Sequence, residues 1–182
     1  MEHQVISGLR AINRGVAIAV GLGLLGCAAF VLTDIILRRF GSSLGGTEEI
    51  AGYAMALATS WGMAFTLLEL GHVRIDLLRS RTGSFARALF DLFSMVVMSG
   101  VVVTIAIKAW PVMRRSVDMG SRANTPLETP LAWVQVPWFA GWVWFATMSC
   151  LVTLAVASLI LKGRAAQTEE IAGAFAEQET LQ

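Results

Sequence analysis

Long apolar stretches fill most of the chain, and short charged connections separate them. A bilayer's hydrocarbon core is about 30 Å thick and needs about 20 apolar residues in a helix. The stretches are apolar on all sides, and backbone inside a bilayer must satisfy its own hydrogen bonds, which favours helices. The pattern therefore predicts an all-α integral membrane protein with four transmembrane helices. The apolar stretches are residues 15–37, 50–68, 88–109 and 131–161.

Turn and capping residues place the helix ends. Gly45 and Gly46 permit a turn before the second helix, and Thr47 is a candidate N-cap. Glu48 and Glu49 then place negative charge at the positive end of the helix dipole. This acidic pair has two interpretations, which are capping at an aqueous boundary and contact with a partner. The helices are predicted at about 15–38, 48–70, 86–110 and 137–161.

Three segments lie outside these helices. Pro137 cannot donate a hydrogen bond inside a helix but is tolerated in a first turn, so residues 131–136 are predicted to form a separate interfacial segment before helix 4. Residues 1–14 are polar with apolar residues on one helical face, and are either an interfacial lead-in or the first turns of helix 1. Residues 165–182 form an acidic tail that we expect to be mobile and solvated.

Composition and charge support the membrane assignment and predict an orientation. Hydrophobic residues make up 55% of the chain and charged residues only 15%. Eight Lys and Arg residues fall on the side of the two termini and six on the other side, so the positive-inside rule predicts cytoplasmic termini. Tryptophan concentrates at membrane interfaces, and five of the six are predicted to mark the interface opposite the termini: Trp110, Trp133, Trp138, Trp142 and Trp144.

The sequence predicts no cofactor, no metal site and no enzymatic activity. Cys27 and Cys150 are far apart and do not form a redox pair. The chain has two histidines and neither lies in a span, which excludes a bis-histidine haem. Glu69, His72 and Asp76 follow helix 2, where a catalytic or metal cluster is one interpretation. A lone histidine without further ligands instead favours an ordered connector along the membrane surface.

Charged residues near the spans are few and lie at their ends. Asp34 and Arg38 are four residues apart at the end of helix 1, and Arg87 and Asp91 repeat this spacing at the start of helix 3. Both pairs are interpreted as boundary contacts. No acidic residue lies in the middle of a span, where a proton-coupled or cation-exporting transporter would need one. The chain alone is therefore not predicted to be a complete pump.

Rows of small residues run along the first two helices. In lipid, small side chains let helix backbones approach closely, which is a main route to association. We therefore expect both helices to pack tightly against other helices, in this chain or in another subunit. The rows are Gly15, Ala19, Gly23 and Cys27 in helix 1, with Gly52, Ala56, Ser60 and Ala64, and Ala54, Ala58, Gly62 and Thr66, in helix 2.

Four fragments occur in a fixed order along these helices. They are TDIILRRFG at 33–41, GTEEI at 46–50, LELGHVRIDLL at 68–78, and TPLETPLAWVQVP at 125–137. Each is weak alone, but their order and spacing make a fairly specific pattern. The chain resembles the small (Q-type) membrane subunit of tripartite ATP-independent periplasmic (TRAP) transporters.

The resemblance implies a role in sodium-coupled uptake at a bacterial inner membrane. In that family a large permease subunit carries the substrate and sodium sites, and a periplasmic substrate-binding protein delivers an organic acid such as a carboxylate. The small subunit extends the static scaffold and contributes to the docking surface. The implied partners are these two proteins and membrane lipids, with no nucleic acid. Candidate motif, structural or subunit-interface residues are Asp34, Arg38, Glu48, Glu49, Glu69, His72, Arg74, Asp76, Pro126 and Pro137, and candidate docking residues are Arg114, Arg115 and Arg122.

Two other functions compete with this one. A self-sufficient homodimeric four-helix transporter would need a membrane-embedded Glu in helix 1, where this chain has apolar residues. A membrane enzyme or redox anchor subunit would need haem ligands, a thiol pair or a polar catalytic cluster. A non-catalytic scaffold subunit fits the sequence best.

Overall fold

The computed structural model describes residues 2–71, 82–168 and 171, and these residues are helical apart from their connections. Each of the four long helices is long and apolar enough to cross a membrane, which confirms the predicted all-α membrane fold. The elements are α1 (Glu2–Arg39), α2 (Thr47–Leu68), α3 (Ser84–Asp118), α4 (Ala132–Leu161) and a short 3-10 helix, η2 (Ala165–Thr168).

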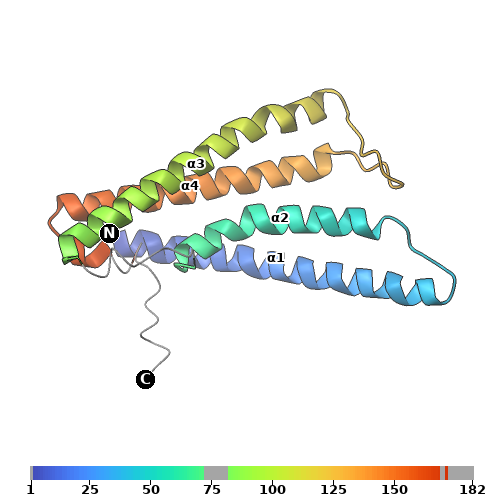
Figure 1. The fold of residues 1–182 in the computed structure, drawn as a ribbon, viewed down its shortest axis with the longest axis horizontal. Coiled ribbons are helices and arrows are strands. Elements are labelled where there is room, and N and C mark those ends of the chain that lie inside the picture. The colour runs from blue at the N-terminus through green and yellow to red at the C-terminus, as the bar shows by residue number, and fades with distance from the viewer. Residues whose placement is uncertain (1, 72–81, 169–170, 172–182) are drawn as a thin grey trace, which may run out of the picture.

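The helices form two antiparallel hairpins that meet along α2 and α4 (Figure 1). α1 packs against α2, α2 against α4, and α4 against α3. Because consecutive helices run in opposite directions, the central pair α2 and α4 runs in the same direction. α1 and α3 therefore form the two edges of the molecule.

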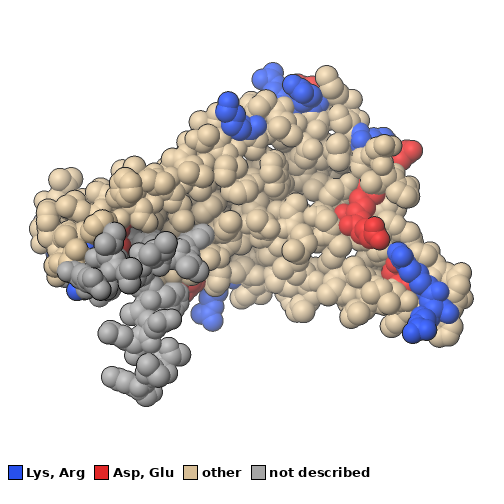
Figure 2. All heavy atoms as spheres, in the orientation of Figure 1, with Lys and Arg blue, Asp and Glu red and all other residues tan. Residues whose placement is uncertain are grey.

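Burial is concentrated on the side of α2, α3 and α4. The largest fully buried side chains include Leu67 of α2, Met95 of α3, and Met148, Val152 and Leu159 of α4. In the most apolar 18-residue window of α1, 0% of residues are buried, against 33% of the corresponding window of α4. α1 therefore contributes almost no apolar core to this chain. Figure 2 shows charged side chains gathered at the end that holds the α1–α2 and α3–α4 connections, and a largely uncharged surface along the middle of the helices.

The predicted break at Pro137 is wrong, because α4 begins at Ala132 and continues through this proline. The carbonyl of Leu131 accepts hydrogen bonds from the backbone N–H of Val134 (3.1 Å) and Gln135 (2.8 Å), which closes the first turn upstream of Pro137. The proline removes one helical hydrogen bond, but its fixed φ fits a helix. The residues before Pro137 are the first turns of α4 and not a separate segment.

α3 also continues past a proline, and the predicted end at residue 110 is wrong. Pro111 lies inside the helix, which ends at Asp118. Met113 and Ser116 beyond the proline are buried, so packing holds the extra turns in place. The 35 residues of α3 give a length of about 52 Å at 1.5 Å per residue.

The described residues near the two ends of the chain differ from the prediction. Residues 2–14 are helical and continuous with the rest of α1. η2 packs against α3 and α4, and Thr168 and Ile171 are 1% and 4% exposed. The prediction of a solvated tail is therefore wrong for these residues. A buried isoleucine gives this segment an apolar anchor that its acidic composition conceals.

Candidate functional site

Asp34 lies at the centre of a polar network between the end of α1 and the start of α2. Its carboxylate accepts hydrogen bonds from the Leu44 backbone N–H (2.7 Å), from the hydroxyl groups of Ser43 (3.0 Å) and Thr47 (2.8 Å), and from Arg38 (2.7 Å). Asp34 is 1% exposed. A buried carboxylate is stable only when its oxygens are paired, and here five donors satisfy them. The predicted Asp34–Arg38 pair is therefore part of a larger network that fixes the connection between α1 and α2.

The N-cap of α2 differs from the prediction. Gly46 is the N-cap residue, in the left-handed region at φ 66°, and no side chain caps the helix. Thr47 is the first helical residue, and its hydroxyl bonds Asp34 instead of its own helix. A Cβ on Gly46 would overlap the side chain of Leu127, which lies in the connection between α3 and α4. Glycine is required here by both its φ and this contact.

Glu49 faces the same connection between α3 and α4. Its Oε1 accepts a hydrogen bond from the Tyr53 hydroxyl (2.7 Å). Thr125, Leu127 and Thr129 of the connection lie near this carboxylate. The second oxygen, Oε2, is enclosed and makes no hydrogen bond of good geometry among the described residues.

The connection between α3 and α4 has a regular internal structure. The Ala123 N–H bonds the Thr129 carbonyl (2.9 Å), and the Leu131 N–H bonds the Ser121 carbonyl (2.9 Å). Pro126 occupies the second position of the turn that the Glu128 N–H closes onto the Thr125 carbonyl (3.0 Å), a position that suits its fixed φ. We call residues 40–46 and 119–131, together with Asp34 and Glu49, the clasp, because Leu127 packs on Gly46 here and joins the two hairpins.

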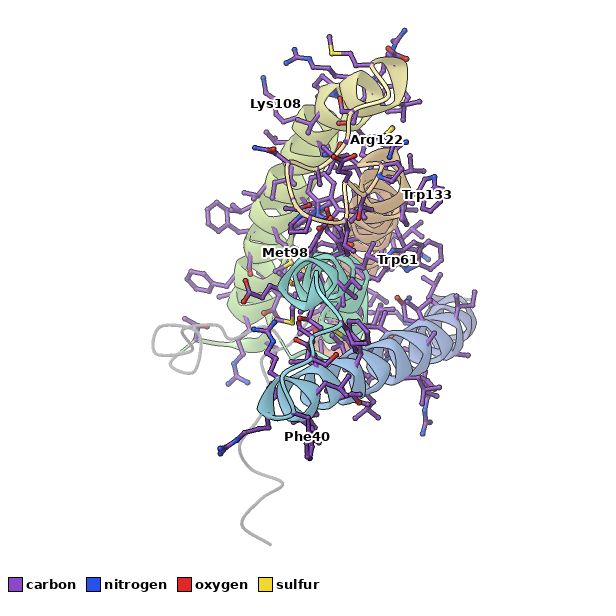
Figure 3. All side chains as sticks on the ribbon, turned by 90° about the vertical axis from the view of Figure 1, so that its right-hand side faces the viewer. Phe40, Trp61, Met98, Lys108, Arg122 and Trp133 are labelled. Carbon is purple, nitrogen blue, oxygen red and sulfur yellow. The ribbon has the colours of Figure 1, made fainter. Side chains whose placement is uncertain are left out.

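Of the three predicted docking arginines, Arg122 lies in the clasp and the other two lie beside it, and their contacts differ. Arg114 pairs with Asp118 (3.5 Å), and both side chains are largely exposed. Arg122 donates a hydrogen bond to the Glu128 carbonyl (3.3 Å). Arg115 is exposed. Figure 2 shows basic side chains over the ends of α1 and α3 at this end of the molecule, with acidic ones between them. Figure 3, which looks onto this end, places Phe40 on the opposite edge from Arg122.

The structure describes only some of the residues predicted at the opposite end of the molecule, where α2 ends and α3 begins. Glu69 follows α2 and is exposed, and Leu70 adopts a positive φ of 57° where the chain leaves the helix. His72, Arg74 and Asp76 lie outside the described residues. Asp91 is 1% exposed, and Arg87 donates to the Thr82 carbonyl (2.9 Å).

Two polar residues of α1 attach this helix to its neighbours. Arg10 donates to the Leu68 carbonyl at the end of α2 (3.2 Å). The side-chain oxygen of Asn13, which is 0% exposed, accepts a hydrogen bond from the Trp144 indole (3.0 Å). Trp144 lies 12 residues after the start of α4, which is about 18 Å at 1.5 Å per residue. This depth is inside the span and not at the interface, so the assignment of Trp144 to the aromatic belt is wrong. Asn13 was not predicted, although a lone amide on an apolar helical face is a visible signal.

α2 and α4 meet at a tight seam. A Cβ on Gly141 would lie 2.5 Å from the Ser60 hydroxyl oxygen and 2.8 Å from the Ser60 Cβ. One turn away, the Trp61 indole donates to the Pro137 carbonyl (3.0 Å). Ser60 and Ala64, from one of the predicted small-residue rows, are both 0% exposed. The second half of this row therefore packs within the chain, as expected for small residues in a membrane.

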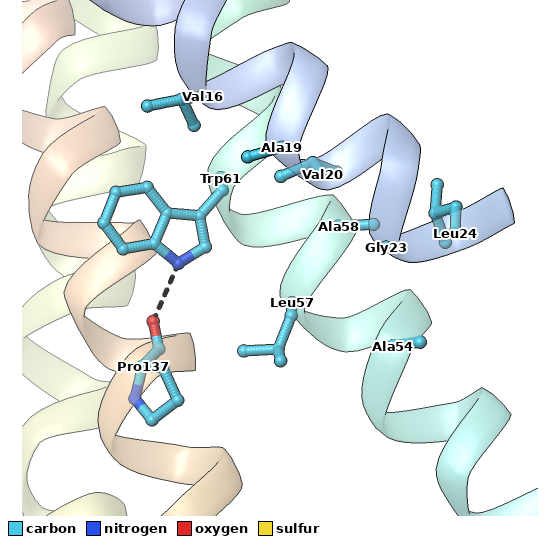
Figure 4. A pocket seen from close by; sticks show the side chains of 10 residues that line it. All are labelled: Val16, Ala19, Val20, Gly23, Leu24, Ala54, Leu57, Ala58, Trp61 and Pro137. Atoms are coloured by element: carbon cyan, nitrogen blue, oxygen red, sulfur yellow. Dashed lines mark hydrogen bonds between the residues drawn. The ribbon is translucent and has the colours of Figure 1, made fainter. Parts of the chain in front are cut away.

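The other rows line an open groove. It has a volume of about 470 Å³ and lies between α1 and α2, with Pro137 of α4 at its edge (Figure 4). Polar contacts hold α1 at both ends of this region, through Asp34 and through Asn13. A Cβ added to Gly15 or Gly23 would meet no atom within 4 Å. The small residues of the groove walls are Ala19, Gly23, Ala54 and Ala58.

Within the described part of the chain, no group of three His, Cys, Asp or Glu residues could hold a metal ion. Cys27 and Cys150 are free thiols.

Residues 27–167 match the family described as "Tripartite ATP-independent periplasmic transporters, DctQ component". No curated protein and no solved structure gives a significant match. The family match covers α2, α3 and α4, the C-terminal third of α1 and both connections of the clasp. The chain therefore belongs to the DctQ family, the small membrane component of TRAP transporters.

Proposed function

We propose that this chain is the non-catalytic small permease subunit of a sodium-driven organic acid transporter in a bacterial inner membrane. It anchors the large permease subunit within the membrane, and its clasp forms part of the docking surface for a periplasmic substrate-binding protein. The observation that carries this proposal is the groove beside α1, together with the unburied small-residue face of that helix.

The groove differs from the lipid-facing surface elsewhere in the chain. The outward face of α3 is bulky, with Phe85, Phe90, Phe93 and Val97 exposed. Such side chains are compatible with lipid. Small residues instead allow the backbone of another helix to approach closely. We therefore assign the groove to a transmembrane helix of the large permease subunit, the membrane partner that the family provides.

We further propose that the clasp faces the periplasm and that both termini are cytoplasmic. Eight of the 14 Lys and Arg residues fall on the side of the termini, in the direction that the positive-inside rule favours. Cysteine labelling in intact cells tests this orientation after Cys27 and Cys150 are replaced. A membrane-impermeant reagent should reach Ser42→Cys and Ser121→Cys but not Ser80→Cys. Labelling of Ser80→Cys alone would reverse the orientation.

Reconstitution in liposomes tests the function itself. The purified subunit should show no saturable organic acid binding and no transport. Adding the large subunit, a loaded binding protein and an inward sodium gradient should produce uptake. Gradient-driven uptake by this subunit alone would refute the scaffold proposal and favour a self-sufficient homodimeric transporter.

A further inference from the structure

We propose that Lys108 and Arg115 of α3 bind the phosphate headgroup of an anionic phospholipid at the end of the molecule that holds the clasp. The site is independent of the proposed function, because it requires only that α3 crosses a membrane with its outer face towards lipid. Arg115 was predicted to dock the binding protein, but the position of Lys108 on the same face favours a lipid as its partner.

The position of Lys108 along α3 places it at the edge of the hydrocarbon core. Residues 88–107 lie between Arg87 and Lys108, and the charged residue among them, Asp91, is 1% exposed. A hydrocarbon core of about 30 Å needs about 20 helical residues, which is the length of this stretch. Trp110 follows two residues after Lys108 and is 48% exposed, as expected for a tryptophan at the interface. Lys108 therefore lies where acyl chains meet headgroups.

Lys108 and Arg115 lie on one outward face of α3. Seven residues are about 20° short of two full turns, and they separate the two residues by about 10 Å along the helix. Val112 between them is 51% exposed, and Val101 on the hydrocarbon side is 55% exposed. Figure 3 shows Lys108 pointing away from the other helices. The face is thus an apolar track that ends in two cations, which matches acyl chains that end in a phosphate.

The two cations are exposed and, among the residues that the structure describes, their side chains make no hydrogen bond or ion pair. Arg114 differs, because it pairs with Asp118 (3.5 Å). The long side chain of Lys108 can extend towards the headgroups and that of Arg115 can reach back, so both can contact one phosphate. Two cations favour a lipid with net negative charge. A soluble binding protein fits less well, because Lys108 lies at the edge of the hydrocarbon core.

The test measures lipid binding to this chain in detergent by native mass spectrometry. The wild type should bind phosphatidylglycerol more tightly than phosphatidylethanolamine, whose ammonium group cancels the phosphate charge. Lys108→Gln and Arg115→Gln should each weaken phosphatidylglycerol binding on the order of fivefold, the effect of one basic side chain near an anionic membrane surface. The matched control Arg114→Gln should bind like the wild type, because its charge is already paired. Lys108→Arg keeps the charge and should retain the lipid.

Equal weakening in Arg114→Gln, or none in Lys108→Gln and Arg115→Gln, would overturn the proposal. So would displacement of the lipid by an equal concentration of inorganic phosphate, which would indicate a site for a free anion. Uptake by the complete transporter provides the third comparison. If Arg115→Gln left lipid binding unchanged but raised the concentration of binding protein needed for half-maximal uptake, the residue would belong to the docking surface and not to a lipid site.

Discussion

The tight seam between α2 and α4 and the open groove beside α1 are built from the same kind of sequence. In both, small residues recur every four positions along α2. In the seam, Ser60 meets Gly141 so closely that a Cβ on the glycine would not fit. In the groove, Ala54 and Ala58 face an opening of about 470 Å³. A small-residue row thus indicates that a helix approaches, but the fold decides whether that helix belongs to the same chain.

The largest effect is expected from filling the seam. Gly141→Leu places four extra carbon atoms where one already overlaps Ser60, so it should separate α2 from α4. Overpacking of this kind costs up to about 3 kcal/mol. We expect a marked fall in the melting temperature of the isolated subunit in detergent. Gly100→Leu in α3 is the control, because a Cβ there meets no atom within 4 Å. Equal melting temperatures for the two variants would show that the seam is not a packing contact.

A smaller effect is expected from releasing α1 at the clasp. Asp34→Ala leaves the Leu44 N–H and the hydroxyl groups of Ser43 and Thr47 without their acceptor. The melting temperature should fall, though less than in Gly141→Leu, because water can reach this end of the molecule. The matched control is Asp118→Ala, which removes an exposed carboxylate with a single ion pair and should have little effect. If Asp118→Ala destabilised the subunit as much as Asp34→Ala, the network would not be what holds α1.

The smallest effect on stability is expected at the polar contact beside the seam. Trp61→Phe removes the indole that donates to the Pro137 carbonyl and keeps most of the aromatic surface. A hydrogen bond of this kind contributes about 1 kcal/mol. Trp133→Phe provides the comparison, because Trp133 is 76% exposed. A melting temperature for Trp61→Phe equal to that of Trp133→Phe would mean that packing alone holds the seam.

The sequence predicted the four helices because length and all-round apolarity determine a membrane span with little help from tertiary contacts. It failed at Pro111 and Pro137, since a proline removes one hydrogen bond but does not end a helix that packing supports. Buried contacts beyond the proline, such as Met113, are visible only in three dimensions.

The sequence predicted several residues of the candidate site but not the contacts between segments far apart in the chain. Asp34 and Arg38 were identified as a pair from their spacing of four residues. The close approach of Leu127 to Gly46 joins segments far apart in the chain, and no local pattern indicates it. The same holds for Asn13 and Trp144, which are 131 residues apart. His72, Arg74 and Asp76 lie outside the described residues, so their role stays a prediction.

The central claim is that the groove beside α1 receives a helix of the large permease subunit, whereas the outer face of α3 meets lipid. A matched pair of leucine substitutions tests it most directly. Gly23→Leu fills the groove and Gly100→Leu enlarges the α3 face, and a Cβ at either glycine meets no atom within 4 Å. The measurement is the amount of large subunit that copurifies with each variant after both are shown to melt like the wild type. We predict that Gly23→Leu loses most of the complex and that Gly100→Leu retains it. Full recovery of the large subunit with Gly23→Leu, or a phospholipid found in the groove of an intact complex, would contradict the account.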